Sequence, residues 1–123
     1  MSYEELRAED LQTQFVYLME NEEEIFRLEQ KTDFQSLQKH ALWAGLKLGM
    51  RVLDVGCGSG ITSYMLKSLV GPEGEVIGID ASESRITHAI KKYSAPGIYF
   101  IRKDIYSNIN SLGTFDFIWV RFF

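Results

Sequence analysis

A glycine-rich stretch directly after an apolar run constrains the fold of this chain more than any other feature. Residues 51–55 (Arg-Val-Leu-Asp-Val) predict a short buried strand, and Gly56, Gly58 and Gly60 follow at once. Residues 61–70 then predict a helix. Because glycine has no Cβ atom, such a loop can turn sharply and let a ligand approach its backbone. The free N–H groups at the start of the next helix point toward that ligand.

The carboxylate of Asp54 stands at the end of the predicted strand, beside the loop. It would repel a phosphate group, whereas it would attract an ammonium or sulfonium group. A dinucleotide-binding loop, Gly-x-Gly-x-x-Gly, is one alternative, but its third glycine would have to replace Ile61 or Ser63. A purely structural turn is the other alternative. The sequence favours a ligand that carries a positive charge.

The run from Asp54 to Gly60 resembles the first motif of the class I S-adenosylmethionine-dependent methyltransferases, Asp/Glu-x-Gly-x-Gly-x-Gly, and matches every fixed position. The resemblance covers roughly residues 22–121. It implies a Rossmann-like parallel α/β sheet and S-adenosyl-L-methionine as the cofactor. It also implies that Asp54 and the loop hold the methionine part of that cofactor. The loop residues concerned are Gly56, Cys57, Gly58 and Gly60.

Two further acidic residues stand at the ends of predicted strands. Asp80, followed by Ala81, can accept two hydrogen bonds from vicinal ribose hydroxyls, although an acid at a helix N-terminus is the alternative. The resemblance implies that Asp104 accepts from the adenine amino group and that the backbone N–H of Ile105 reaches the ring. The alternative for Asp104 is a turn residue. Both positions therefore predict contacts with a nucleoside.

The last predicted strand, residues 115–120, resembles the fourth motif of the same family. The resemblance implies that Val120 and Arg121, at its end, line the methionine end of the cofactor and the substrate mouth. Arg121 would bind an acidic substrate or the ligand carboxylate, or else lie on the surface in solvent. Asp116 is read as structural, and no general base is identified.

Strands and helices alternate along the second part of the chain, which predicts a parallel sheet with right-handed crossovers. The resemblance gives its strand order as 3-2-1-4. Three helices are expected upstream, so the chain divides into an N-terminal helical cap region (1–48) and a cofactor-binding half (49–123). A run around Glu24 and Arg27 resembles a helix of the menaquinone-methylase type. The expected segments are strands 51–55, 75–80, 98–103 and 115–120, and helices 3–20, 22–31, Thr32-Asp33 to Gly45, 61–70 and 82–93.

The predicted strands number four, whereas the class I fold has seven. The last strand would be an open edge that carries Phe117, Ile118 and Trp119. We therefore expect the N-terminal half of a longer protein, inactive alone and able to self-associate through this edge. The alternative is a short protein that completes its sheet by dimerising.

Composition restricts location and partners. No apolar run approaches the roughly 18–20 residues of a membrane span, and the single cysteine, Cys57, favours a reducing cytoplasm. Residues 1–33 hold 10 acidic and 3 basic side chains, and residues 34–123 hold 7 and 10. No basic stripe with interleaved aromatic residues supports a nucleic acid partner. One cysteine and two distant histidines do not make a metal site.

The sequence predicts methyl transfer from S-adenosyl-L-methionine to a small-molecule acceptor. Two other classes stay open at this point. One is a non-catalytic module that binds S-adenosylmethionine, since the motifs concern the donor and none concerns the acceptor. The other is a dinucleotide-dependent oxidoreductase.

Overall fold

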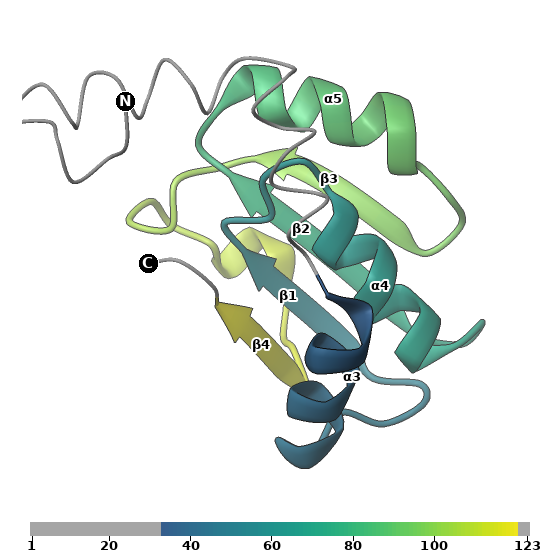
Figure 1. Cartoon of the computed structure of the whole chain (residues 1–123). Helices are drawn as coiled ribbons and strands as arrows, with labels where there is room; N and C mark the ends of the chain where they lie inside the picture. Colours follow the sequence, from purple (N-terminus) through teal and green to yellow (C-terminus); the bar gives the residue numbers. More distant parts are fainter. Residues whose placement is uncertain (1–32, 121–123) are drawn as a thin grey trace, which may run out of the picture.

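A computed structural model describes residues 33–120, in which four strands form one parallel sheet (Figure 1). The strand order is β3-β2-β1-β4, which confirms the predicted Rossmann-like sheet. The expected helices 3–20 and 22–31, the run around Glu24 and Arg27, and Arg121 lie outside the described residues. The strands are β1 (Arg51–Val55), β2 (Glu75–Asp80), β3 (Ile98–Arg102) and β4 (Phe117–Val120).

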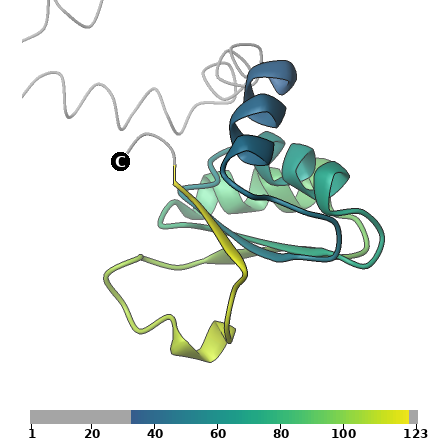
Figure 2. The ribbon, with the colours of Figure 1, turned by 90° about the horizontal axis from the view of Figure 1, so that it is seen from below.

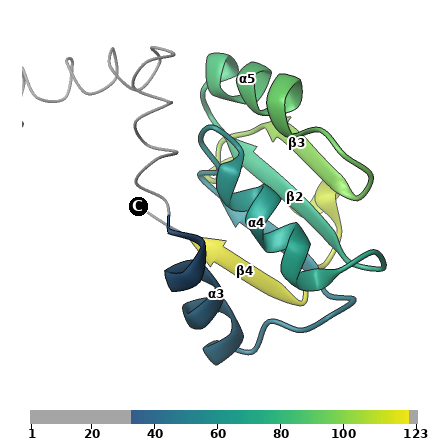
Figure 3. The ribbon, with the colours of Figure 1, turned by 45° about the vertical axis from the view of Figure 1, so that its right-hand side comes forward.

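Three helices lie on one face of this sheet: α3 (Phe34–Trp43), α4 (Ile61–Val70) and α5 (Glu83–Tyr93) (Figures 1 and 3).

The start of α5 follows from its capping residue. The Oγ of Ser82 accepts a hydrogen bond from the backbone N–H of Arg85 at 3.3 Å, so Ser82 is the N-cap and Glu83 is the first helical residue. The helix predicted from residue 82 therefore begins one residue later.

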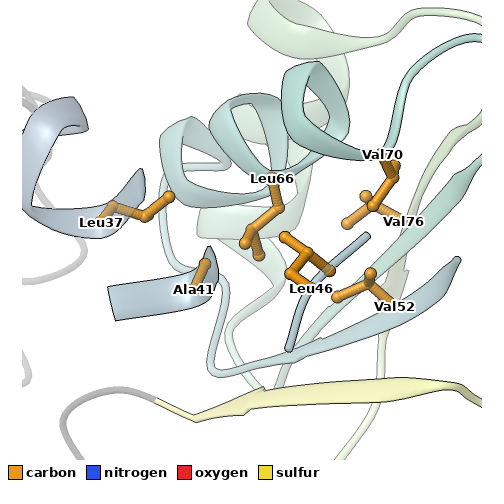
Figure 4. Packing of buried hydrophobic residues seen from close by; sticks show 7 residues of the cluster. All are labelled: Leu37, Ala41, Leu46, Val52, Leu66, Val70 and Val76. Atoms are coloured by element: carbon orange, nitrogen blue, oxygen red, sulfur yellow. The ribbon is translucent and has the colours of Figure 1, made fainter. Parts of the chain in front are cut away.

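The first core lies between the helices and the sheet and includes residues of α3 (Figure 4). Leu37 and Ala41 of α3 are buried together with side chains of α4, β1 and β2. The part of the predicted cap region that the structure describes thus shares a core with the sheet. The division at residue 48 stays a prediction. The buried residues are Leu37, Ala41, Leu46, Val52, Leu66, Val70 and Val76.

The opposite face of the sheet is covered by the β3–β4 connection, residues 103–116, which we call the crossover segment (Figure 2). It contains a short 3₁₀ helix, η2 (Asn110–Leu112). Its serines and asparagines are typical of a polar loop, yet the segment packs apolar side chains on the sheet. The buried strand residues are Leu53, Val55, Ile77 and Ile79, and the residues that cover them are Ile105, Ile109, Leu112 and Phe115.

Arg51 fastens the end of the crossover segment to the start of β1. Its Nη1 donates to the carbonyl of Thr114 at 2.7 Å, and its Nη2 donates to the carbonyl of Leu112 at 2.6 Å. Its guanidinium lies 4.5 Å from the centre of the Phe115 ring. The carboxylate of Asp116 accepts from the backbone N–H of Arg51 at 2.9 Å. The predicted strand 115–120 starts at Phe117 because the two residues before it serve this attachment.

β4 is an edge strand within the described residues, since β1 is its partner on one side and residues 33–120 supply none on the other. Ile118 and Val120 are 58% and 52% exposed. No helix of the described range is long and apolar enough to cross a bilayer.

Candidate functional site

The glycine loop is pinned to the second strand by its own backbone. The N–H groups of Gly56 and Cys57 both donate to the carbonyl of Ile79 at 2.9 Å. Gly56, Gly58 and Gly60 have φ values of +72°, +57° and +97°, which belong to the left-handed region that L side chains rarely adopt. The predicted loop therefore forms where expected, and α4 starts directly after it.

Gly58 and Gly60 differ in how much space surrounds them. A Cβ atom on Gly60 would lie 2.8 Å from the Cβ of Ala89 and 3.0 Å from the ring of Phe100. A Cβ atom on Gly58 would have no atom within 4 Å. Gly60 is thus required by the packing of α5 and β3 against the loop, whereas Gly58 borders open space that a ligand can enter.

Asp54 lies beneath the loop with its carboxylate turned inward. It is 1% exposed, and its Oδ2 accepts a hydrogen bond from the Oγ of Ser63 at 2.7 Å. Ser63 belongs to the first turn of α4, so Asp54 ties the strand to the helix that follows the loop. A direct contact of Asp54 with a ligand stays a prediction.

Asp80 joins the glycine loop to the start of α5. Its Oδ2 accepts from the backbone N–H of Gly58 at 3.0 Å, and its Oδ1 accepts from the N–H of Ser82 at 2.9 Å. The Nη1 of Arg85 lies 3.6 Å from Oδ2. The role of an acid at a helix N-terminus, considered as an alternative, is therefore present in the structure. Sequence reasoning missed Arg85, because only the turn between β2 and α5 brings it beside this carboxylate.

A cavity of about 200 Å³ opens at the carboxyl ends of the first three strands. This is the edge where open parallel sheets bind their ligands. Five residues of the predicted site line it, together with Lys103 and Tyr106, which sequence reasoning did not single out. The predicted residues are Gly56, Asp80, Ala81, Asp104 and Ile105.

Asp104 forms a turn at the rim of this cavity. Its Oδ1 accepts from the backbone N–H of Tyr106 at 2.9 Å, and its carbonyl accepts from the N–H of Ser107 at 3.0 Å. The turn role considered for Asp104 is thus present as well. Since a carboxylate has several acceptor positions, Asp104 keeps the capacity to accept from a ligand.

Other predicted site residues do not line the cavity. The side chain of Cys57 is 4% exposed and packs with Ile86, Ala89 and Phe100 on the helix side of the sheet. Val120 pairs in register with Val55, which lines the cavity. Gly58 and Gly60 lie in the loop, outside the lining residues.

The environment of Cys57 makes its thiol a poor nucleophile. Burial raises the pKa of the Cys57 thiol far above its usual range, and the carboxylates of Asp54 and Asp80 raise it further. We expect negligible modification by iodoacetamide at pH 8 in the folded protein and rapid modification in urea, measured by mass spectrometry. Equal labelling rates in the folded and unfolded protein would contradict this environment.

The parallel order and the cavity at the strands' carboxyl ends define the protein as a Rossmann-like α/β domain whose cavity lies where such sheets bind their ligands. A family model described as a methyltransferase domain matches residues 46–121, more than half of the chain. The chain belongs to this family, the class I S-adenosylmethionine-dependent methyltransferases.

Relatives of this chain include proteins named as quinone methyltransferases. The chain is 33% identical over 98 residues to demethylmenaquinone methyltransferase of Geobacillus kaustophilus, with 71% of this chain and 42% of that protein covered. It is 45% identical over 47 residues to 2-phytyl-1,4-naphtoquinone methyltransferase of Synechococcus elongatus, with 38% and 20% covered. The chain thus spans less than half the length of either relative.

Solved structures of the same class share the fold. A SAM-dependent methyltransferase from Aquifex aeolicus superposes with a TM-score of 0.56 at 28% identity, over 73% of this chain and 57% of that one. A protein-L-isoaspartate O-methyltransferase superposes with a TM-score of 0.62 at 26% identity, over 68% and 27%.

Proposed function

We propose that the protein transfers a methyl group from S-adenosyl-L-methionine to a small-molecule acceptor. The observation that carries this proposal is the cavity, in which the acidic residue at the end of β2 and a turn after β3 meet the glycine loop. In a chain of the methyltransferase family, these are the positions expected to hold the cofactor.

The residues present suit this cofactor. Asp80 offers acceptor oxygens to ribose hydroxyls, and Asp104 with Ile105 offers an acceptor and a backbone donor to adenine. The open space at Gly58 gives the methionine part access to the loop, and the negative charge of Asp54 complements a cationic ligand. Bound S-adenosylmethionine supplies a methyl group already activated by its sulfonium, so the protein's main task is to align donor and acceptor.

A quinone-type ring is the first acceptor to test, because the relatives are named as methyltransferases of naphthoquinone and menaquinone compounds. Calorimetry of the intact protein with S-adenosylhomocysteine should show one-to-one binding, and labelled S-adenosylmethionine should methylate a reduced demethylated naphthoquinone. Binding without transfer to any acceptor would favour a non-catalytic module. Preference for NAD over S-adenosylhomocysteine would overturn the proposal in favour of an oxidoreductase.

The open edge at β4 supports self-association of this 123-residue chain. The side chain of Ile118 is 58% exposed beside backbone groups that no described strand pairs. We expect dimers or larger species in size-exclusion chromatography, reduced by Ile118→Lys because a charge opposes strand pairing. Tyr99→Lys, a similar change on the other edge strand, is the control. A monodisperse wild-type monomer would contradict the prediction.

A cytoplasmic location is also part of the proposal. Cys57, the single cysteine of the chain, is a free buried thiol, and a reducing compartment would keep it so.

A further inference from the structure

An aromatic side chain at the mouth of the cavity has no part in the function argued above. Tyr106 lines the cavity yet is 88% exposed. Aromatic rings contribute most when they bury their large apolar surface, so an exposed ring beside a cavity has much to gain from a ligand. Tyr106 is the single aromatic residue among the described residues that line this cavity.

The backbone that carries Tyr106 is held in place by the turn at Asp104. The N–H of Tyr106 donates to Asp104 Oδ1 at 2.9 Å, and the Oγ of Ser107 donates to the Asp104 carbonyl at 2.5 Å. The same residue that is expected to contact a base thus fixes the attachment point of the ring. A fixed backbone lowers the entropy lost when the ring settles on a ligand.

The walls of the cavity suit a flat ring with hydrogen-bond donors on its edge. The lining includes the apolar residues Val55, Ile79 and Ile105. It also includes Asp80 and Asp104, whose side chains are acceptors, and the cationic Lys103. A volume of about 200 Å³ lies below the roughly 300–1,000 Å³ of sites that enclose a whole drug-sized ligand. A base in this cavity would therefore keep one face toward solvent unless a side chain covers it.

We propose that Tyr106 covers this face by stacking on the nucleobase, and so makes the site specific for an aromatic base. This inference rests on the proposed function, because it concerns the adenosine half of the same ligand. Stacking tolerates any base, so Tyr106 selects for a ring system, while Asp104 distinguishes among rings by their donors.

The test is calorimetry of the intact protein with S-adenosylhomocysteine and with adenosine. Tyr106→Ala should weaken binding of both ligands by about 5- to 150-fold, the range for loss of one base–aromatic stack. Tyr106→Phe should bind within roughly twofold of wild type, since the ring is retained. Tyr99→Ala is the matched control, because Tyr99 is a half-exposed tyrosine that does not line this cavity.

The outcomes separate this inference from the proposed function. Wild-type affinity for both ligands in Tyr106→Ala would overturn the stacking role and leave the proposed function standing. Absence of binding to the wild-type protein would overturn both. Because the ring is exposed, thermal melting should show an unchanged midpoint in Tyr106→Ala, so that a loss of affinity reports on the ligand contact.

Discussion

Replacing Gly60 by alanine is expected to destabilise the protein by about 2–5 kcal/mol, a large share of the stability of a typical domain. Two causes add. The left-handed backbone of Gly60, with φ of +97°, costs about 1–2 kcal/mol for a residue with a side chain. The new methyl group would also lie 2.8 Å from the Cβ of Ala89, and such overpacking costs about 1–3 kcal/mol.

Gly58→Ala is the matched variant for this measurement. Gly58 shares the left-handed conformation, with φ of +57°, but a Cβ atom there meets nothing within 4 Å. Only the backbone cost of about 1–2 kcal/mol should appear in urea unfolding. Affinity for S-adenosylhomocysteine should nevertheless fall at least about tenfold, since a methyl group would occupy the ligand's approach to the loop. Equal unfolding midpoints for the two variants would show that the contacts around Gly60 are relaxed.

The second large effect is a loss of ligand affinity when Asp80 is replaced. Losing a charge-assisted pair of hydrogen bonds to ribose costs about 2–3 kcal/mol, so Asp80→Ala should weaken S-adenosylhomocysteine binding by roughly 30–150-fold. Part of the lost affinity would come from the glycine loop. Asp80 also accepts from the N–H of Gly58 at 3.0 Å, so its removal would release the loop.

A deoxy ligand separates the two contributions of Asp80. Wild-type protein should bind adenosine more tightly than 2′-deoxyadenosine, and Asp80→Ala should bind both alike. Arg85→Gln is the control, because it removes the cation at 3.6 Å and leaves the carboxylate in place. If wild-type protein bound both nucleosides equally, the ribose contact would be wrong and Asp80 would act through the loop alone.

The elements beside the glycine loop could be predicted from local sequence. Strands at 51–55 and 75–80 and the helix at 61–70 have the bounds predicted for them. Apolar runs that end at glycine or at a helix cap leave little freedom in where they start and stop. The predicted strand 98–103 ends one residue earlier, at Arg102, and the turn at Asp104 follows.

The polar composition of the crossover segment conceals the regular spacing of its apolar residues. Ile105, Ile109, Leu112 and Phe115 recur at intervals of three or four residues among serines and asparagines, and all four pack on the sheet. That interval was the signal available in the sequence. The contacts of Arg85 with Asp80 and of Arg51 with Thr114 had no comparable signal, since each depends on a distance set by the folded chain.

The double use of the crossover segment has a consequence for protein engineering. Its first residues, Lys103 to Tyr106, form one wall of the cavity. Its later residues cover the face of the sheet opposite the helices, and Arg51 holds the end of the segment. Ile105 belongs to both groups. A library that varies this wall to accept a new cofactor analogue would therefore also vary the protein's solubility and yield. Positions 103 and 106, which lie outside the buried cluster, are the ones to randomise first.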